Sequence, residues 1–285
     1  MNYYYDCEFL EGKQKERFPI SLFRKETLPT IDLISIGIVS EDGREYYAIS
    51  KDFNLKEAWN RFDLKETHVP MNKPLKKGSG VKKVYWIREN VLKSIWRQLY
   101  QKGYGVMAQI EIMSGAYDSQ FTYKILKKLI EKHGKTNKQI AEEVKDFVIE
   151  KDAYETVVCP EFYYDDLGKR NANERLQKGE LVKTVQKLKQ KSEINLYGYY
   201  SAYDHVCLSW LFGKMMDLPE GFPKYTRDLK QIMDEYAEKV PVAFNMDEGL
   251  KAMKFHQDYP KQENEHSAIH DARWNKKLHE FLKSL

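Results

Sequence analysis

Two acidic residues near the start of the chain, Asp6 and Glu8, stand two positions apart in the segment YYDCEFLEG. The aromatic and apolar residues around them favour a β-strand over residues 3–9. Side chains of a strand alternate between its faces, so both carboxylates point to one face and Cys7 to the other. Two carboxylates on one face repel each other, which costs free energy. The cost is small if the pair lies on a solvent-facing edge, and it is removed if a hard cation such as Mg²⁺ or Mn²⁺ neutralises the charges. We therefore treat Asp6 and Glu8 as candidate metal ligands.

A second candidate group lies near the end of the chain, in the segment EHSAIHDA over residues 265–272. A helical pattern over residues 269–282 places Asp271 on the face that carries later leucines and must pack inward, where a carboxylate requires a partner. His266 falls in the loop before this helix, from which it could lie over whatever Asp271 binds. The alternative for His266 is an ordinary surface histidine, which is also our expectation for His270.

A third acid, Asp204, stands where a strand expected at residues 194–200 leads into a helix expected at 202–212. An acid in the first helical turn is favoured by the helix dipole, so Asp204 is either a common structural residue or a third ligand.

The remaining elements are read from periodicity. Apolar runs at 32–39 and 45–50, separated by the turn Glu41-Asp42-Gly43, form with the first strand an antiparallel meander. Strands followed by mixed strands and helices predict an α/β layer with a mixed sheet. Further helices are expected at residues 86–103, 119–133, 137–151, 172–191 and 226–240.

Composition sets the outer limits. With 42% hydrophobic and 13% aromatic residues in 285, the chain can bury a proper core, which excludes global disorder. A net charge of +4 excludes a polybasic protein. Three widely spaced cysteines indicate neither a disulfide framework nor a structural zinc site.

The start MNYYYDCEFLEG does not read as a secretory signal and no apolar run reaches about 18 residues, so we expect a cytoplasmic protein without a membrane partner.

The order Asp-x-Glu, Asp and His-x₄-Asp resembles the DEDDh 3′→5′ exonuclease superfamily, which has a ribonuclease H-like fold. Within it, the chain is most similar to the mycobacterial-type 3′→5′ exoribonucleases. The stretches that carry the resemblance are YYDCEFLEG, DLISIGIVSEDGREYYAIS, WIRENVL, SAYDHVCLSWLFG, FPKYTRDLKQ and HSAIHDAR. Each motif alone is weak evidence, whereas their joint presence in this order is specific.

The resemblance implies that four carboxylates hold two divalent cations, Mg²⁺ or Mn²⁺, namely those of Asp6, Glu8, Asp204 and Asp271. It also implies that His266 is the general base, a role suited to a side chain that titrates near neutral pH. Phe9 and Leu10 match the positions at which the family stacks or wedges the terminal base, although core packing would ask for the same side chain at Phe9.

A decoy for the middle acid occurs at Asp118, in the segment SGAYDS, which also precedes a helical pattern. Asp204 is preferred because only it continues into HVCLSWLFG and is followed by FPKYTRDLKQ. Asp118 is otherwise expected to cap a helix.

The resemblance also implies one exonuclease domain over residues 1–285, a ribonuclease H-like mixed sheet flanked by helices. Extra chain, compared with the compact family pattern, lies at about residues 67–83, 99–135 and 152–192, the last with a helix of its own. Five lysines in residues 72–83 mark either a mobile surface loop or a contact with RNA phosphates. The oligomeric state, including a homodimer, stays open.

The predicted function is that of a metal-dependent 3′→5′ exoribonuclease that releases nucleoside 5′-monophosphates from single-stranded RNA. One alternative is the same hydrolysis on DNA, because recognition of the 2′-hydroxyl rests on backbone geometry that the sequence does not display. The other is a nucleic-acid-binding protein without catalysis, in which the insertions make the functional contacts.

Overall fold

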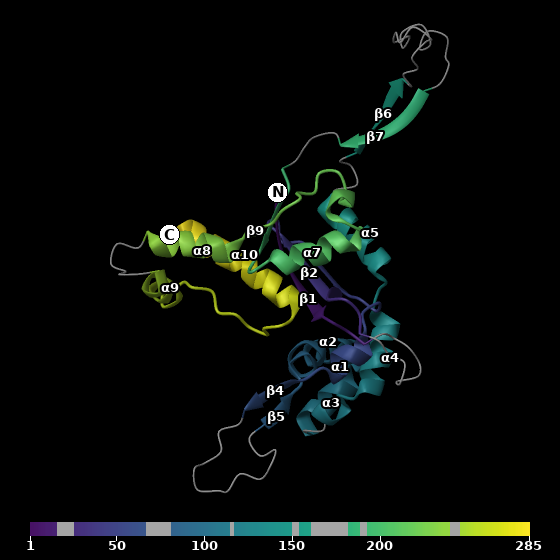
Figure 1. Cartoon of the computed structure of the whole chain (residues 1–285), viewed down its shortest axis with the longest axis vertical. Helices are drawn as coiled ribbons and strands as arrows, with labels where there is room; N and C mark the ends of the chain where they lie inside the picture. Colours follow the sequence, from purple (N-terminus) through teal and green to yellow (C-terminus); the bar gives the residue numbers. More distant parts are fainter. Residues whose placement is uncertain are drawn as a thin grey trace.

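The computed structural model describes residues 1–15, 26–66, 81–114, 117–149, 154–160, 182–188, 193–239 and 246–285. At its centre is a five-stranded mixed sheet in the order β3-β2-β1-β8-β9, with helices on both faces (Figure 1). This arrangement confirms the α/β class with a mixed sheet. No helix in these ranges is long and apolar enough to cross a membrane.

The first three strands form the predicted meander. β1 (Asn2–Gly12) pairs antiparallel with β2 (Thr30–Ser40), and β2 pairs antiparallel with β3 (Glu45–Ile49). β8 (Asn195–Gly198) and β9 (Arg227–Asp228) then extend the sheet parallel to β1. The predicted fourth strand at 194–200 is therefore confirmed as β8.

The alternation of side chains along β1 divides the core between the two faces of the sheet. Tyr3, Tyr5 and Cys7 are buried in one cluster with residues of α5 (Asn137–Val148) and α7 (Ala202–Leu211). Tyr4, on the other face, packs with residues of α8 (Leu229–Glu238) and α10 (Ala268–Ser284). The face that carries Asp6 and Glu8 is thus the face covered by α10.

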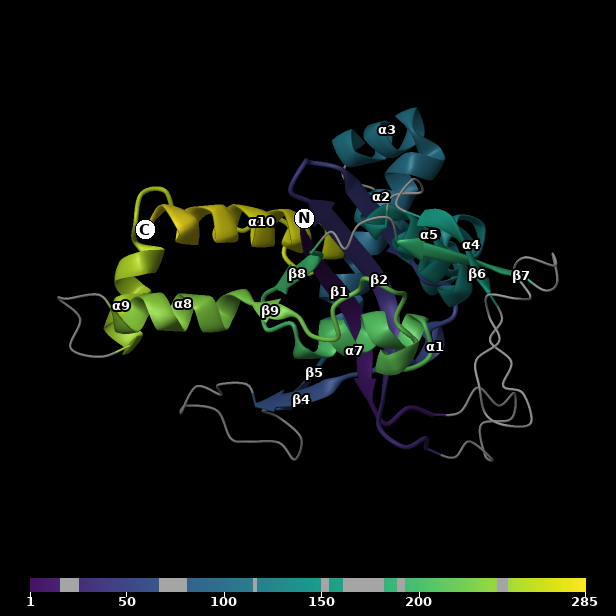
Figure 2. The same ribbon diagram turned by 90° about the horizontal axis from the view of Figure 1, so that it is seen from above.

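Beyond the sheet, α8 and α10 extend side by side, and α9 (Met246–Lys254) lies across their far ends (Figure 2). A separate helical lobe lies below the sheet in Figure 1 and encloses a second core around the fully buried Trp96. Its elements are α1 (Leu55–Asn60), β4 (Asp63–Glu66), β5 (Val81–Val84), the π-helical turn η2 (Arg88–Leu92), α2 (Lys93–Tyr104), α3 (Val106–Ser114), the 3-10 turn η3 (Tyr117–Gln120) and α4 (Tyr123–His133).

Several helix boundaries differ from the predicted ones for local reasons. The helix expected at 86–103 runs through η2 and α2 to Tyr104, because the chain leaves the helix at Gly105 with φ +47° rather than at Gly103. The helix expected from 119 starts four residues later, where the Thr122 hydroxyl accepts a hydrogen bond from the amide of Ile125. The helix expected from 226 starts at Leu229, because Asp228 acts as its N-cap.

The helix expected at 172–191 is wrong over the residues that the structure describes there. Residues 182–188 form β7 (Val182–Leu188), which pairs antiparallel with β6 (Tyr154–Pro160) in a sheet of their own. Apolar residues at 182, 185 and 188 suggest a helix, but β-branched residues at 182, 184 and 185 favour a strand once a partner strand is present. Residues 172–181 and 189–191 lie outside the described part of the chain.

One glycine fixes how closely α10 approaches the sheet. Gly37 of β2 pairs with Asp6 of β1, and a Cβ added at Gly37 would lie 2.4 Å from backbone atoms of Ala268 and Ile269. The start of α10 therefore rests directly on the backbone of β2, beside the acidic pair of β1. This close packing brings Asp271 to the face that carries Asp6.

Candidate active site

A pocket of about 680 Å³ opens over the α10 face of β1, at the end where β1 leads toward the helical lobe. It is lined by residues from five parts of the chain: Asp6, Cys7, Glu8, Phe9, Glu11, Gly12, Arg61, Asp63, Trp86, Ile87, Tyr199, Tyr200, Asp204, Gln262, His266, Asp271, Trp274 and Asn275. All five residues predicted to perform or support catalysis are in this set.

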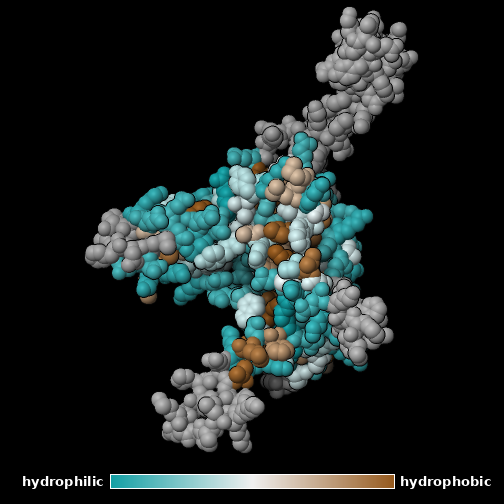
Figure 3. Space-filling model, in the orientation of Figure 1, coloured by the Kyte–Doolittle hydropathy of each residue, from teal (hydrophilic) through white to brown (hydrophobic). Residues whose placement is uncertain are grey.

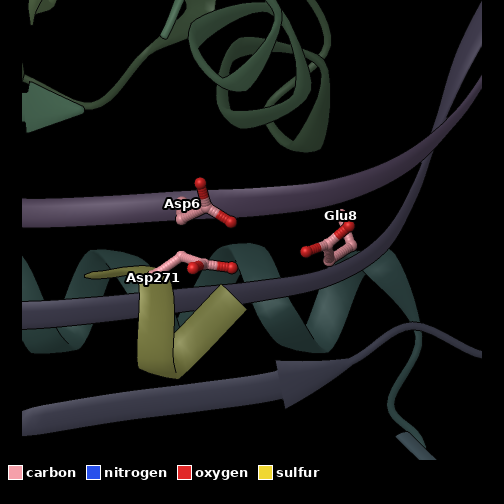
Figure 4. A group of neighbouring side chains, drawn as sticks. All are labelled: Asp6, Glu8 and Asp271. Atoms are coloured by element: carbon pink, nitrogen blue, oxygen red, sulfur yellow. The ribbon is translucent and has the colours of Figure 1, made fainter. Parts of the chain in front are cut away.

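Three of the predicted carboxylates converge at the floor of the pocket. One carboxylate oxygen from each of Asp6, Glu8 and Asp271 lies within 4.8 Å of the others (Figure 4). Asp6 and Glu8 project from β1, and Asp271 projects from the first turn of α10. The alternation of side chains along the strand and the inward face of the helix are the two reasons that these groups meet.

The fourth carboxylate, Asp204, reaches the same pocket from the first turn of α7. Its Oδ1 accepts a hydrogen bond of 2.7 Å from the backbone amide of Cys7, which lies between the two acids of β1. The decoy Asp118 lies in η3, where its side chain is 59% exposed and forms ion pairs with Lys93 and Arg97. Of the two acids with similar local sequence, the structure thus brings Asp204 to the pocket.

Hydrogen bonds hold the Asp271 carboxylate in place. Gln262 Nε2 donates to Oδ1 at 2.7 Å, and the amide of Ser267 donates to Oδ2 at 3.1 Å. The Ser267 hydroxyl is in turn hydrogen-bonded to the Nε2 of Gln98 and to the Nδ1 of His270. His270, expected on the surface, is half-buried and supports the turn that leads into α10.

Burial and mutual repulsion raise the pKa of the acidic cluster. Burial raises the pKa of Asp6 well above its ordinary value, and the neighbouring charges of Asp204, Glu8 and Asp271 raise it further. Glu8 is shifted upward for the same reasons, and burial raises the pKa of Asp204 to about 7. The pKa of Asp271 is also raised by burial. The fold therefore concentrates negative charge where it costs free energy unless a cation is bound.

His266 lies in the loop before α10, as predicted, and lines the pocket beside the carboxylates. Its ring packs edge to face against Trp86, with 4.6 Å between ring centroids. Its backbone has φ +64°, a left-handed conformation that costs a non-glycine residue about 1–2 kcal/mol. The contact with Trp86 holds the imidazole at the pocket and helps to maintain this strained backbone.

The two residues predicted to contact the terminal base differ in position. Phe9 is half-buried, lines the pocket and packs edge to face against Tyr203, with 5.8 Å between ring centroids. Leu10 has no exposed surface and lies in the core of the helical lobe. Leu10 alternates onto the same face of β1 as Asp6 and Glu8, but there the helical lobe covers it, so direct contact with a base is left to Phe9.

The cluster of Asp6, Glu8 and Asp271 suits a hard divalent cation. All the donors are carboxylate oxygens, the ligands that Mg²⁺ and Mn²⁺ prefer, and no lysine or arginine of the described chain forms an ion pair with any of them. Buried carboxylates with upward-shifted pKa values and no cationic partner are costly, and a bound cation removes that cost. The residues therefore fit the implied metal.

Comparison with known proteins agrees with this chemistry. The family model of the 3′-5′ exoribonuclease Rv2179c-like domain matches residues 25–282. The chain belongs to this family. Two proteins of Mycobacterium tuberculosis, named 3′-5′ exoribonuclease Rv2179c (strain ATCC 25618 / H37Rv) and 3′-5′ exoribonuclease MT2234.1 (strain CDC 1551 / Oshkosh), are each 23% identical to it over 242 residues, which cover 82% of this chain and 75% of the relative. The prediction of an exoribonuclease enzyme is confirmed by this membership.

Sequence reasoning missed several residues that shape the pocket. Gln262 lies in an irregular loop, where no periodic signal marks it as the partner of Asp271. Trp86 lies in the stretch WIRENVL, which carried part of the resemblance, but nothing local indicates that its ring meets His266. Arg61 reaches the pocket from the end of α1, within the lobe whose role the sequence did not reveal.

Proposed function

We propose that this protein is a metal-dependent 3′→5′ exoribonuclease that releases nucleoside 5′-monophosphates from single-stranded RNA. The observation that carries the proposal is the convergence of carboxylates from β1 and α10 in a pocket that also contains Asp204 and His266. Membership of an exoribonuclease family supports RNA rather than DNA as the substrate. An assembled cluster of buried acids argues against a protein that only binds, because such a cluster is a liability without an ion.

The fold supports a ribonuclease H-like, DEDDh-type assignment. Three antiparallel strands are followed by two strands that extend the sheet parallel to β1, and the acids come from β1, α7 and α10 in the expected order. On this proposal the chain is one exonuclease domain, with the helical lobe and the β6–β7 hairpin as additions to it.

The proposed reaction is hydrolysis of the last phosphodiester bond. Asp6, Glu8, Asp204 and Asp271 would hold two divalent ions, which, when bound, activate the attacking water and stabilise the leaving oxygen. His266 accepts a proton from that water on an imidazole nitrogen. Water oxygen joins the phosphorus as the bond to the 3′ oxygen of the preceding nucleotide breaks. The departing oxygen takes up a proton from solvent and His266 returns its proton to solvent, which leaves a nucleoside 5′-monophosphate and an RNA with a free 3′ hydroxyl.

On this proposal, Phe9 orients the terminal nucleotide of the RNA. Its ring lines the pocket beside the acids, where it can stack on the terminal base. Stacking requires an unpaired base, so a blunt duplex should react slowly, by an amount that reflects a few kcal/mol of lost pairing and stacking.

The test compares a linear oligoribonucleotide, its circular form and a blunt hairpin at equal concentration, with Mn²⁺ and with EDTA. We expect shortening of the linear RNA with Mn²⁺, slow reaction of the hairpin, resistance of the circle and no reaction in EDTA. Comparable cleavage of the circle would establish endonuclease action, and full activity in EDTA would contradict metal dependence. The rate on a DNA oligonucleotide of the same linear sequence, compared with the rate on the RNA, measures the preference for RNA.

A further inference from the structure

An aromatic and cationic surface lies where the β4–β5 hairpin joins the helical lobe, at the mouth of the acidic pocket. We call it the hairpin platform. It is formed by four residues: Phe62, Lys83, Tyr85 and Arg88. Lys83 belongs to the lysine-rich stretch whose alternative interpretation was a contact with RNA phosphates.

The geometry of the hairpin brings these side chains together. Phe62 immediately precedes β4 and Tyr85 immediately follows β5, and the adjacent strand residues pair with each other, so the two rings face across the hairpin. Their centroids are 5.8 Å apart at an interplanar angle of 61°. The Lys83 ammonium lies 4.2 Å from the Phe62 centroid, and the Arg88 guanidinium lies 3.8 Å from the Tyr85 centroid.

The platform is accessible, and neither of its cations is paired with a carboxylate of the described chain. Phe62 is 40% exposed and Lys83 is exposed, while Tyr85 and Arg88 are half-buried. Within the described ranges, no carboxylate lies within ion-pair distance of Lys83 or Arg88, although the Arg88 Nε donates to the backbone carbonyl of Trp59 at 2.7 Å. Aromatic faces next to unpaired cations are what single-stranded nucleic acids bind, since bases stack and phosphates are neutralised.

The platform adjoins the acidic pocket at the base of the hairpin. Arg61 and Asp63, on either side of Phe62, line the pocket, and so does Trp86, which follows Tyr85, so the pocket-lining and platform side chains alternate along the same two strands. Figure 3 shows the surface hollowed between the arm of α8 to α10 and the helical lobe, with hydrophobic colour over β4–β5 at the rim of the hollow. An RNA whose 3′ end occupies the pocket can therefore reach the platform by crossing the base of the hairpin with its preceding nucleotides.

We propose that the hairpin platform binds the nucleotides on the 5′ side of the scissile phosphate, with bases stacked on Phe62 and phosphates beside Lys83. This inference rests on the proposed exoribonuclease function. The platform would favour longer RNA over dinucleotides, because a dinucleotide fills the pocket without reaching β4–β5.

The experiment measures kcat/KM with Mn²⁺ on a diribonucleotide and on an octaribonucleotide of the same base. Phe62→Ala and Lys83→Gln should each lower kcat/KM for the octamer roughly tenfold, the order expected for loss of one stacked base or one phosphate contact, and leave the dimer within about twofold. The effect should appear in KM rather than in kcat. The Lys83 variant should also lose about one unit of the slope of log affinity against log salt concentration.

Two control variants match these changes. Lys254→Gln removes an exposed lysine at the end of α9, and Phe255→Ala removes the neighbouring phenylalanine, which is 87% exposed and far from the pocket. Both should retain parental kinetics on the octamer. Thermal melts of all four variants identify any that fail to fold.

Two results would overturn the proposal. Parental kinetics of Phe62→Ala and Lys83→Gln on the octamer would show that RNA does not use the platform, which would then be free for a protein partner. Equal losses on dimer and octamer would show that the platform only supports the pocket. If the parent hydrolyses neither RNA, the proposed function fails. The platform is then tested by binding of a labelled octamer in EDTA: a higher Kd for Phe62→Ala than for the parent supports RNA binding there, and equal Kd values contradict it.

Discussion

Replacing Asp204 by asparagine tests whether the acidic cluster is built for a cation. Asparagine keeps an oxygen that can accept the hydrogen bond from the Cys7 amide and removes the charge. Burial raises the pKa of Asp204 from an ordinary value of 3.8 to about 7, so keeping it ionised in the fold costs about 4 kcal/mol at pH 8. The variant should therefore be more stable than the parent when metal is absent.

The pH dependence follows from the direction of the shift. The folded carboxyl binds its proton more tightly than the unfolded one, so its cost is absent below about pH 4 and complete above pH 7. Loss of a favourable charge near the start of α7 subtracts about 0.5 kcal/mol from the gain. With roughly 2–4 °C per kcal/mol for a chain of this size, we expect the metal-free melting temperature at pH 8 to rise by roughly 7–14 °C.

The assay is thermal unfolding of parent and variant at pH 5 and pH 8, in EDTA and with Mn²⁺. The extra stability of the metal-free variant should shrink to about 2 kcal/mol or less at pH 5. Mn²⁺ should stabilise the parent more than the variant. Asp118→Asn is the matched control, because this exposed acid with a similar local sequence should alter neither the pH dependence nor the response to Mn²⁺. A metal-free Asp204→Asn that melts below the parent at pH 8, or equal responses to Mn²⁺, would refute the reasoning.

Three further changes have expected outcomes. His266→Ala should lower kcat by roughly 10²–10⁴-fold with little loss of metal binding, and His270→Ala should be milder in the same steady-state assay; equal losses would mean that His266 has no special role. Gly37→Ala should lower both stability and activity, because the new methyl group displaces the start of α10; a melting temperature and kcat unchanged from the parent would contradict that packing. Burial lowers the pKa of His279 to about 4, so the folded protein holds this side chain neutral. The free energy of unfolding therefore falls by about 2 kcal/mol as the pH drops from 6.5 to 5. In EDTA melts His279→Asn, which can still accept from the Tyr4 hydroxyl, should lose less stability over that range, and a parental pH slope would count against the assignment.

Much of the site could be predicted because its acids sit on regular elements. The period of two along β1 puts Asp6 and Glu8 on one face, and the period of the last helix turns Asp271 inward. The choice between Asp204 and Asp118 was different, since both follow similar tetrapeptides and precede helices. The flanking stretches HVCLSWLFG and FPKYTRDLKQ favoured Asp204, and the path of the chain through the sheet brings it beside β1.

The parts that sequence reasoning missed depend on contacts between distant segments. Residues 182–188 have a helical spacing of apolar residues, but pairing with β6 makes this segment the strand β7. Gln262 acquires its role from Asp271, nine positions away through an irregular loop. Leu10 alternates onto the face of Asp6 and Glu8, but the helical lobe, which is distant in sequence, packs over that end of the face and buries it.

The most direct test of the proposed reaction is digestion of a linear oligoribonucleotide with Mn²⁺ in water enriched in oxygen-18, followed by mass spectrometry of the products over time. The two-ion exoribonuclease proposed here predicts nucleoside 5′-monophosphates, each with one labelled oxygen in its phosphate, released successively from the 3′ end. Asp6→Asn should fold and release almost none. Products with 3′ phosphates, internal fragments at early times, or parental release by Asp6→Asn would contradict it.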